Sequence, residues 1–141
     1  MNEFLARRKF MHTVAHVVLT CIMAWFAYVF LDDHPTFVGN RSFDYFAMWG
    51  TEQQWGVSCL AASALGVASF RSPFWKIECF GASVLASMHG VFAILFFIGN
   101  PHGTAVAPYA GYAIIGASLA YSTAYNGKRG APHLEPDDTP G

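Results

Sequence analysis

The feature that most constrains this chain is a stretch without charged side chains at residues 11–31, MHTVAHVVLTCIMAWFAYVFL. At about 1.5 Å per residue, a helix of this length crosses the roughly 30 Å apolar core of a bilayer. The basic residues 7–9 precede the run, and the acidic pair 32–33 follows it directly. The pattern predicts a membrane-spanning helix whose amino end lies on the cytoplasmic side.

Three further apolar runs follow, at residues 54–70, 77–98 and 105–125, and Glu78 is the only charged residue within them. A water-soluble helical bundle needs a charged stripe along each helix, and none of these runs has one. The composition agrees, because 12% of the residues are charged, against about 25% in soluble domains. We therefore expect an all-α, polytopic integral membrane protein with four transmembrane helices.

Local signals predict where these helices begin. Thr51 and Gln54 have the spacing of a capping box at the start of the second helix. Ser72, followed by proline, is typical of an N-cap with proline at the first helical position. Thr104 is a candidate N-cap for the fourth helix, and Pro108 falls within its first turn, where the missing amide is harmless.

The basic residues predict the orientation. Of the eight Lys and Arg residues, the segment 32–53 contains one, Arg41. The other seven flank the opposite ends of the predicted helices: Arg7, Arg8, Lys9, Arg71, Lys76, Lys128 and Arg129. By the positive-inside rule, both termini are cytoplasmic and residues 32–53 form an outer loop. The chain then divides into a basic cytoplasmic segment 1–10, a transmembrane domain 11–125 and a tail 126–141.

The outer loop and the tail have different characters. Within the loop, Phe43, Phe46 and Ala47 have helical spacing, which favours a short helix lying at the membrane interface. An aromatic loop folded over the bundle fits the same residues. The tail is rich in proline, glycine and charge, and is predicted to be disordered.

Small residues recur at four-residue steps along three of the helices. Because the hydrophobic effect does not distinguish helix from lipid inside a bilayer, helices associate where small side chains let their backbones approach. We expect the second, third and fourth helices to pack tightly and the bulkier first helix to face lipid; an oligomer contact along one stripe is the alternative. The candidate packing residues are Ser58, Ala62, Gly66, Ala82, Ala86, Gly90, Gly116, Ala120 and Ala124.

Histidines are the candidates for chemistry. His89 falls near the middle of the third span, and an ionisable group there is a functional hypothesis by default; a neutral imidazole bonded to a neighbouring helix is the structural alternative. His12 and His16 are four residues apart, but two ligands do not make a metal site. A bis-histidine haem is disfavoured because His16 and His89 differ in expected depth by about 10 Å.

Other classes of function are weakly represented. Cys21, Cys59 and Cys79 lack the spacing of a zinc site or a disulfide framework, and we interpret them as buried thiols. The formal net charge of −1 does not favour binding to nucleic acid. No nucleophile–base pair, phosphate-binding loop or carboxylate pair is recognisable, so we expect neither an enzyme nor a cofactor.

Part of the sequence resembles a known group of proteins. The segment EQQWG at 52–56, a helix rich in small residues, RSP at 71–73, and then Pro101 and Tyr109 are similar to small four-span membrane proteins of tailed bacteriophages. Many of these have no known function, and some are labelled holin-like. The resemblance covers about residues 53–125 and implies a bacterial inner-membrane location and a role in lysis. His89 and the long aromatic loop depart from the pattern.

Three functions are therefore compatible with the sequence. The first is a non-enzymatic, holin-like membrane protein that assembles into lesions, which requires helices with a mildly polar face; the serines at 83, 87, 118 and 122 are candidates for that face. The second is a structural or accessory subunit of a larger membrane complex. The third is a proton or small-solute pathway around His89.

Overall fold

The computed structural model describes residues 2–130 except 40, 71, 73 and 102, with side chains described between residues 10 and 127. Its described residues form α-helices, one short 3-10 turn and connecting loops, with no strand among them. The elements are α1 (Asn2–Leu31), η1 (Arg41–Phe43), α2 (Asp44–Trp49), α3 (Glu52–Phe70), α4 (Trp75–Gly99) and α5 (Val106–Gly130). The expected all-α class is confirmed.

Two helices meet a length and hydropathy criterion for crossing a membrane. They cover Phe10–Leu31 in α1 and Trp75–Gly99 in α4. The other two expected spans correspond to α3 and α5, which are continuous helices of 19 and 25 residues.

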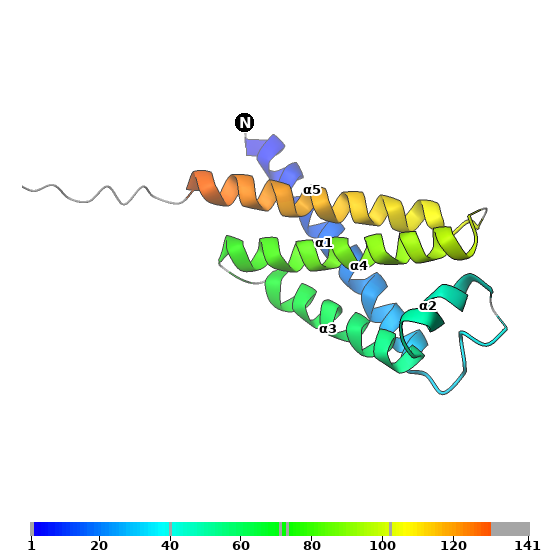
Figure 1. Ribbon diagram of the computed structural model, residues 1–141. Helices are drawn as coiled ribbons and strands as arrows, with labels where there is room; N and C mark the ends of the chain where they lie inside the picture. Colours follow the sequence, from blue (N-terminus) through cyan, green and yellow to red (C-terminus); the bar gives the residue numbers. More distant parts are fainter. Residues whose placement is uncertain (1, 40, 71, 73, 102, 131–141) are drawn as a thin grey trace, which may run out of the picture.

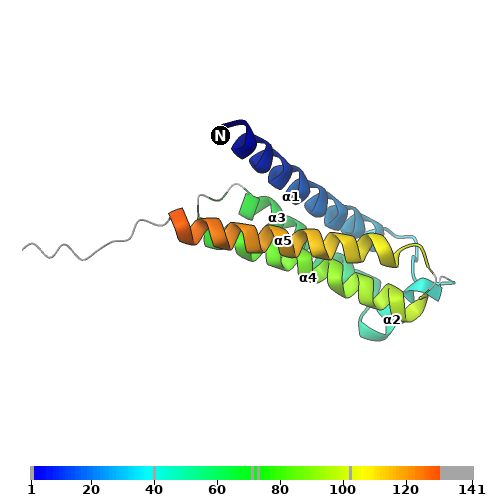
Figure 2. The ribbon, with the colours of Figure 1, turned by 90° about the horizontal axis from the view of Figure 1, so that it is seen from above.

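The long helices pack as two pairs. α4 and α5 lie side by side and antiparallel, and α1 packs mainly against α3 (Figures 1 and 2). The pairs are joined chiefly by contacts of α3 with α4, whereas α1 touches α4 and α5 much less. Figure 2 shows α1 diverging from α5 toward its amino end. We call the end of the bundle that carries α2 the loop end and the opposite one the terminal end.

The expectation that the bulky first helix faces lipid is wrong for one side of α1. Its large side chains supply much of the core, since Leu19, Met23, Phe26, Ala27 and Phe30 are buried. They pack inward because glycines in α3 let the two helices approach closely: a Cβ at Gly66 would lie 2.6 Å from Thr20 Oγ1. On the opposite side of α1, Trp25 and Tyr28 are 63% and 62% exposed. Only that side fits the expected lipid-facing role.

The predicted capping box is confirmed at the start of α3. The Thr51 amide donates to Gln54 Oε1 at 2.9 Å, and the Gln54 amide donates to Thr51 Oγ1 at 3.2 Å. These reciprocal bonds satisfy two amide groups near the first turn. They also fix the point at which the chain leaves the loop and enters α3.

Two other helix boundaries differ from the sequence prediction. α4 begins at Trp75 rather than directly after Ser72, whose hydroxyl instead accepts from the Phe74 amide at 3.2 Å in the turn before the helix. α5 continues through residues 126–130, which we assigned to the tail. Within this extension, Gly127 packs so closely on the Trp75 indole that a Cβ would clash with it. The rest of the predicted disordered tail, residues 131–141, lies outside the described residues.

The outer loop combines both of the expected alternatives. It contains a short helix, α2, and that helix is folded onto the bundle. Phe46 is fully buried, and the Trp55 indole donates to its carbonyl oxygen at 3.0 Å. Around Phe46 lies an aromatic cluster that seals the loop end, made of Phe26, Phe30, Phe37, Phe43, Phe46, Trp55, Phe92, Phe96 and Tyr109.

Candidate functional site

His16 lies buried between α1 and α3. Its side chain is 1% exposed, and its Nε2 lies 3.0 Å from the carbonyl oxygen of Gly66, to which it donates. Ser69 Oγ approaches the same nitrogen at 3.4 Å. Because Nε2 carries the hydrogen, Nδ1 presents a lone pair, and it has no partner among the described residues. His16 therefore joins two helices while one polar atom is left unsatisfied.

His89 has a similar arrangement on the inner side of α4. It is fully buried, and its Nδ1 donates to the carbonyl oxygen of Leu85 at 2.8 Å, one turn earlier in the same helix. Nε2 then carries the lone pair and has no partner within the described ranges. The rings of Tyr109 and Tyr112 on α5 pack beside the imidazole, at centroid distances of 6.5 and 5.5 Å. The described contacts thus include no hydrogen bond from His89 to a neighbouring helix.

His12 joins three helices nearer the terminal end. Its Nδ1 lies 3.5 Å from Glu78 Oε1 on α4. Its Nε2 lies 3.0 Å from Ser122 Oγ and 3.2 Å from Thr123 Oγ1 on α5. We call these four residues the His12 cluster.

The described partner of Glu78 comes from another helix, although Lys76 is close to it in the sequence. The carboxylate faces His12, while Lys76 Nζ lies 5.9 Å from the centre of the Trp75 ring. Arg71 lies outside the described residues. The partner of Glu78 is therefore a residue of α1 that lies far from it in the sequence.

Three polar residues of α1 share one face. His12, His16 and Thr20 follow at four-residue steps, which places them along one side of a helix. His16 and Thr20 are buried, and Thr20 Oγ1 donates to the His16 carbonyl oxygen at 2.9 Å. This face, which we call the polar face of α1, is directed into the bundle.

The described residues do not gather a metal-binding group. No set of three His, Cys, Asp or Glu side chains within the described ranges lies close enough to hold an ion. His12 and His16 engage different neighbours, since the first contacts α4 and α5 and the second contacts α3. His16 and His89 likewise pack against different helices, α3 and α5.

The prediction that all three cysteines are buried is wrong for one of them. Cys59 is buried and Cys79 is half-buried, with its thiol 3.4 Å from the Ala120 carbonyl oxygen. Cys21 is exposed. It lines a groove of about 490 Å³ between α1 and α5, together with Val17, Val18, Ile22, Trp25, Phe26, Tyr109 and Tyr112.

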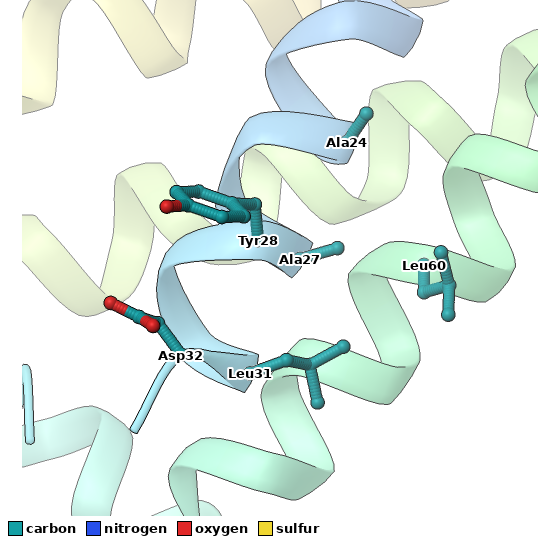
Figure 3. Close-up of a pocket in the computed structure, with 6 residues that line it drawn as sticks. All are labelled: Ala24, Ala27, Tyr28, Leu31, Asp32 and Leu60. Atoms are coloured by element: carbon teal, nitrogen blue, oxygen red, sulfur yellow. The ribbon is translucent and has the colours of Figure 1, made fainter. Parts of the chain in front are cut away.

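A second groove runs along the other side of α1. It has a volume of about 380 Å³ and lies between α1 and α3 near the loop end, where Ala24, Ala27, Tyr28, Leu31, Asp32 and Leu60 line it (Figure 3). Apart from the Tyr28 hydroxyl and the Asp32 carboxylate, these side chains are apolar. Neither groove presents a set of converging polar groups.

The serines proposed as a polar face of α4 and α5 donate their hydroxyl hydrogens within their own helices. Ser83, Ser87, Ser118 and Ser122 each donate to a carbonyl oxygen of their own helix, at 2.8 to 2.9 Å. Ser122 also accepts from His12. The main buried polar groups are instead His16, Thr20, Ser63, Ser69, His89 and Thr123.

The small-residue stripes meet their neighbours to different degrees. Gly116 packs against Ala86 so closely that a Cβ would lie 2.8 Å from the Ala86 Cβ. Gly90 faces Ala113 at ordinary contact distance. Ala62 and Ala82 are buried, whereas Ser58 is exposed and its hydroxyl donates to the Gln54 carbonyl oxygen. Ala120 and Ala124 are half-buried.

Comparison with family models, curated proteins and solved structures found no match for this chain.

Proposed function

We propose that the chain is a four-span membrane protein with both termini in the cytoplasm of a bacterial cell, placed in its inner membrane. Large apolar side chains cover the outside of the helices: Val57, Leu60 and Val67 on α3 are all more than half exposed. Ile94, Phe97 and Ile114 are exposed in the same way on α4 and α5. An apolar exterior of this kind suits a lipid solvent, and the basic flanks supply the orientation.

Within that membrane we propose a holin-like role, in which closed bundles accumulate and later open into lesions. The observation that supports it is the polar face of α1, which is packed inward, whereas large apolar side chains such as Val14, Val18 and Trp25 are exposed elsewhere on the helix. A lesion needs such a face to turn from neighbouring helices to water. On opening, water would also satisfy His16 Nδ1 and His89 Nε2, which have no partner in the described part of the closed bundle.

This role requires several copies of the chain to associate within the lipid bilayer. It involves no catalytic step. The resemblance to small phage membrane proteins points the same way. The two-pair packing suits it as well, because the helices of each pair are in more extensive contact with each other than with the other pair, so the pairs can separate while each stays together.

The test is expression in a bacterium with continuous measurement of the membrane potential. The potential should persist while the protein accumulates and then collapse abruptly. His16→Leu makes the polar face of α1 apolar and should delay or abolish the collapse. His34→Ala is the matched control, because His34 is an exposed loop residue paired only with Asp32 among the described contacts. Cells that keep their potential throughout at full expression would exclude the holin-like role.

A specific observation favours a second candidate, a proton or small-solute pathway. His89 Nε2 is a buried lone pair without a described partner, at a position where a proton or a water molecule could bind. In vesicles, His89→Ala should then abolish proton flux or its pH dependence, and an unchanged flux would end this idea. The alternative of an accessory subunit rests on Met48 and Trp49, which are 73% and 77% exposed beside the loop; recovery of a clean monomer after mild extraction would count against it.

A further inference from the structure

The groove between α1 and α3 owes its shape to two alanines. Four of its lining residues belong to the last two turns of α1: Ala24, Ala27, Tyr28 and Leu31. They are three or four residues apart and therefore share one side of the helix. The short side chains of Ala24 and Ala27 leave a hollow beside the longer ones, and Leu60 of α3 lies across it (Figure 3). Its volume of about 380 Å³ falls within the range of ligand sites, about 300 to 1,000 Å³.

Two polar groups lie along one edge of this groove at the loop end. The Asp32 amide donates to the Tyr28 carbonyl oxygen at 3.0 Å, so Asp32 continues the last turn of α1. Residues four apart on a helix are neighbours on its surface. Figure 3 shows that the Tyr28 hydroxyl and the Asp32 carboxylate both point away from Leu60. The groove therefore offers one hydroxyl and one anion beside an apolar floor.

The Asp32 carboxylate is accessible to a further cation. Its described charged partner is His34, whose Nδ1 lies 3.2 Å from Asp32 Oδ2, and the two side chains are 91% and 43% exposed. Exposed pairs of this kind contribute little free energy, and the described contacts include no partner for Asp32 Oδ1. The segment 32–53 also carries four acidic residues against one basic residue, Arg41. The charge at this end of the groove therefore favours a cation and opposes an anion.

A phospholipid with a primary ammonium head group matches these features. Its ammonium can donate a charge-assisted hydrogen bond to Asp32, its phosphate can accept from the Tyr28 hydroxyl, and an acyl chain can lie over the two alanines. An anionic phospholipid would instead bring negative charge to Asp32. A second copy of the chain in a symmetric contact would bring its own acidic loop to the same place.

We propose that the groove between α1 and α3 binds one phosphatidylethanolamine molecule through Asp32 and Tyr28. The site rests on the membrane location in the proposed function, but not on the holin-like role. Because an acyl chain gains no hydrophobic stabilisation when it leaves lipid for a helix surface, the head group determines which lipid is retained.

Native mass spectrometry of the full chain, released from detergent micelles, tests this site. The protein is mixed in turn with phosphatidylethanolamine, phosphatidylcholine and phosphatidylglycerol that carry identical dioleoyl chains, and the fraction with one bound lipid is measured. Phosphatidylethanolamine should be retained about two- to fivefold more than phosphatidylglycerol, as an exposed ion pair allows. Phosphatidylcholine should fall between them, because its ammonium has no N–H group.

Matched variants separate the head-group contact from the groove itself. Asp32→Asn should abolish the preference, whereas Asp33→Asn, at the neighbouring exposed residue, should keep it. Ala24→Phe fills the groove from an exposed position and should lower retention of all three lipids. Ala117→Phe is its control, because Ala117 is exposed on α5 and does not line this groove.

Equal retention of phosphatidylethanolamine and phosphatidylglycerol by the native chain, or a preference that survives in Asp32→Asn, would overturn the proposal. A dimer that is lost in Ala24→Phe, without any lipid preference, would assign the groove to a second copy and also overturn it. An Asp32-dependent preference in a protein that never collapses the membrane potential would retain the lipid site and reject the holin-like role. A chain that is monodisperse without detergent would reject both.

Discussion

Gly116 is a residue at which α5 packs closely against the backbone of α4. A Cβ there would meet the Ala86 Cα at 2.9 Å and its backbone nitrogen at 3.1 Å, and a backbone cannot move aside as a flexible side chain can. Gly116→Ala should therefore destabilise the bundle by about 1–3 kcal/mol, as overpacking does. Thermal unfolding in detergent measures this change.

Gly111 provides the matched control on the same helix. A Cβ at that position would have nothing within 4 Å. Since alanine is favoured over glycine in a helix by about 1 kcal/mol, Gly111→Ala should leave the stability unchanged or raise it slightly. Equal destabilisation by the two substitutions would contradict the close α4–α5 contact.

The sequence predicted which residues take part in packing or polar contacts better than it predicted which residues they contact. The four-residue steps indicated Ala86 and Gly116 as packing residues, but only the fold places them against each other. His12 looked like half of an incomplete metal site because its partners Glu78 and Ser122 are far away along the chain. The spacing of residues within one helix carries no information about what a neighbouring helix presents to them.

Among the elements, α2 depends most on tertiary contacts. It has six residues, no side-chain cap and one fully buried side chain, Phe46. Because helices this short are unstable alone, its position depends on the aromatic cluster. Phe46→Ala should lower the free energy of unfolding by about 3–5 kcal/mol. It should also make the loop accessible to a protease added to spheroplasts.

Trp49→Ala is the control for that experiment, because Trp49 lies in the same helix and is 77% exposed. It should change neither the unfolding midpoint nor the cleavage rate. If Phe46→Ala also left the unfolding midpoint and the cleavage rate unchanged, this would contradict the claim that Phe46 holds α2 on the bundle.

The helix boundaries show where local sequence rules succeed. The capping box at Thr51 and Gln54 was predictable because both partners lie within one turn. Local rules did not predict the late start of α4 at Trp75 or the extension of α5 past residue 125. At both boundaries the chain includes a residue of the contact between Trp75 and Gly127, and local rules do not register this contact because the two residues are distant in the sequence. The buried side of α1 was missed for the same reason, since the bulk of Phe26 and Phe30 does not reveal the α3 glycines opposite α1.

At the scale of the whole molecule, two helix pairs enclose an apolar core that includes a few polar side chains, and large apolar side chains also cover the exterior. The buried side chains of His16 and His89 lie within this interior, and the aromatic cluster closes its loop end. Composition and charge-free runs were enough to predict the all-helical class, because they depend on totals along each segment. The arrangement into pairs depends on which faces meet, and the sequence pattern leaves that open.

The central claim is that the chain crosses a membrane four times and keeps both ends in the cytosol. The direct measurement attaches a reporter that is active only in the cytosol to each end in turn, and a reporter active only outside to the loop near Gly39. Both terminal fusions should be active in the cytosol and the loop fusion outside, with the protein requiring detergent for extraction. Opposite compartments for the two ends, or a monodisperse protein in buffer without detergent, would contradict the account.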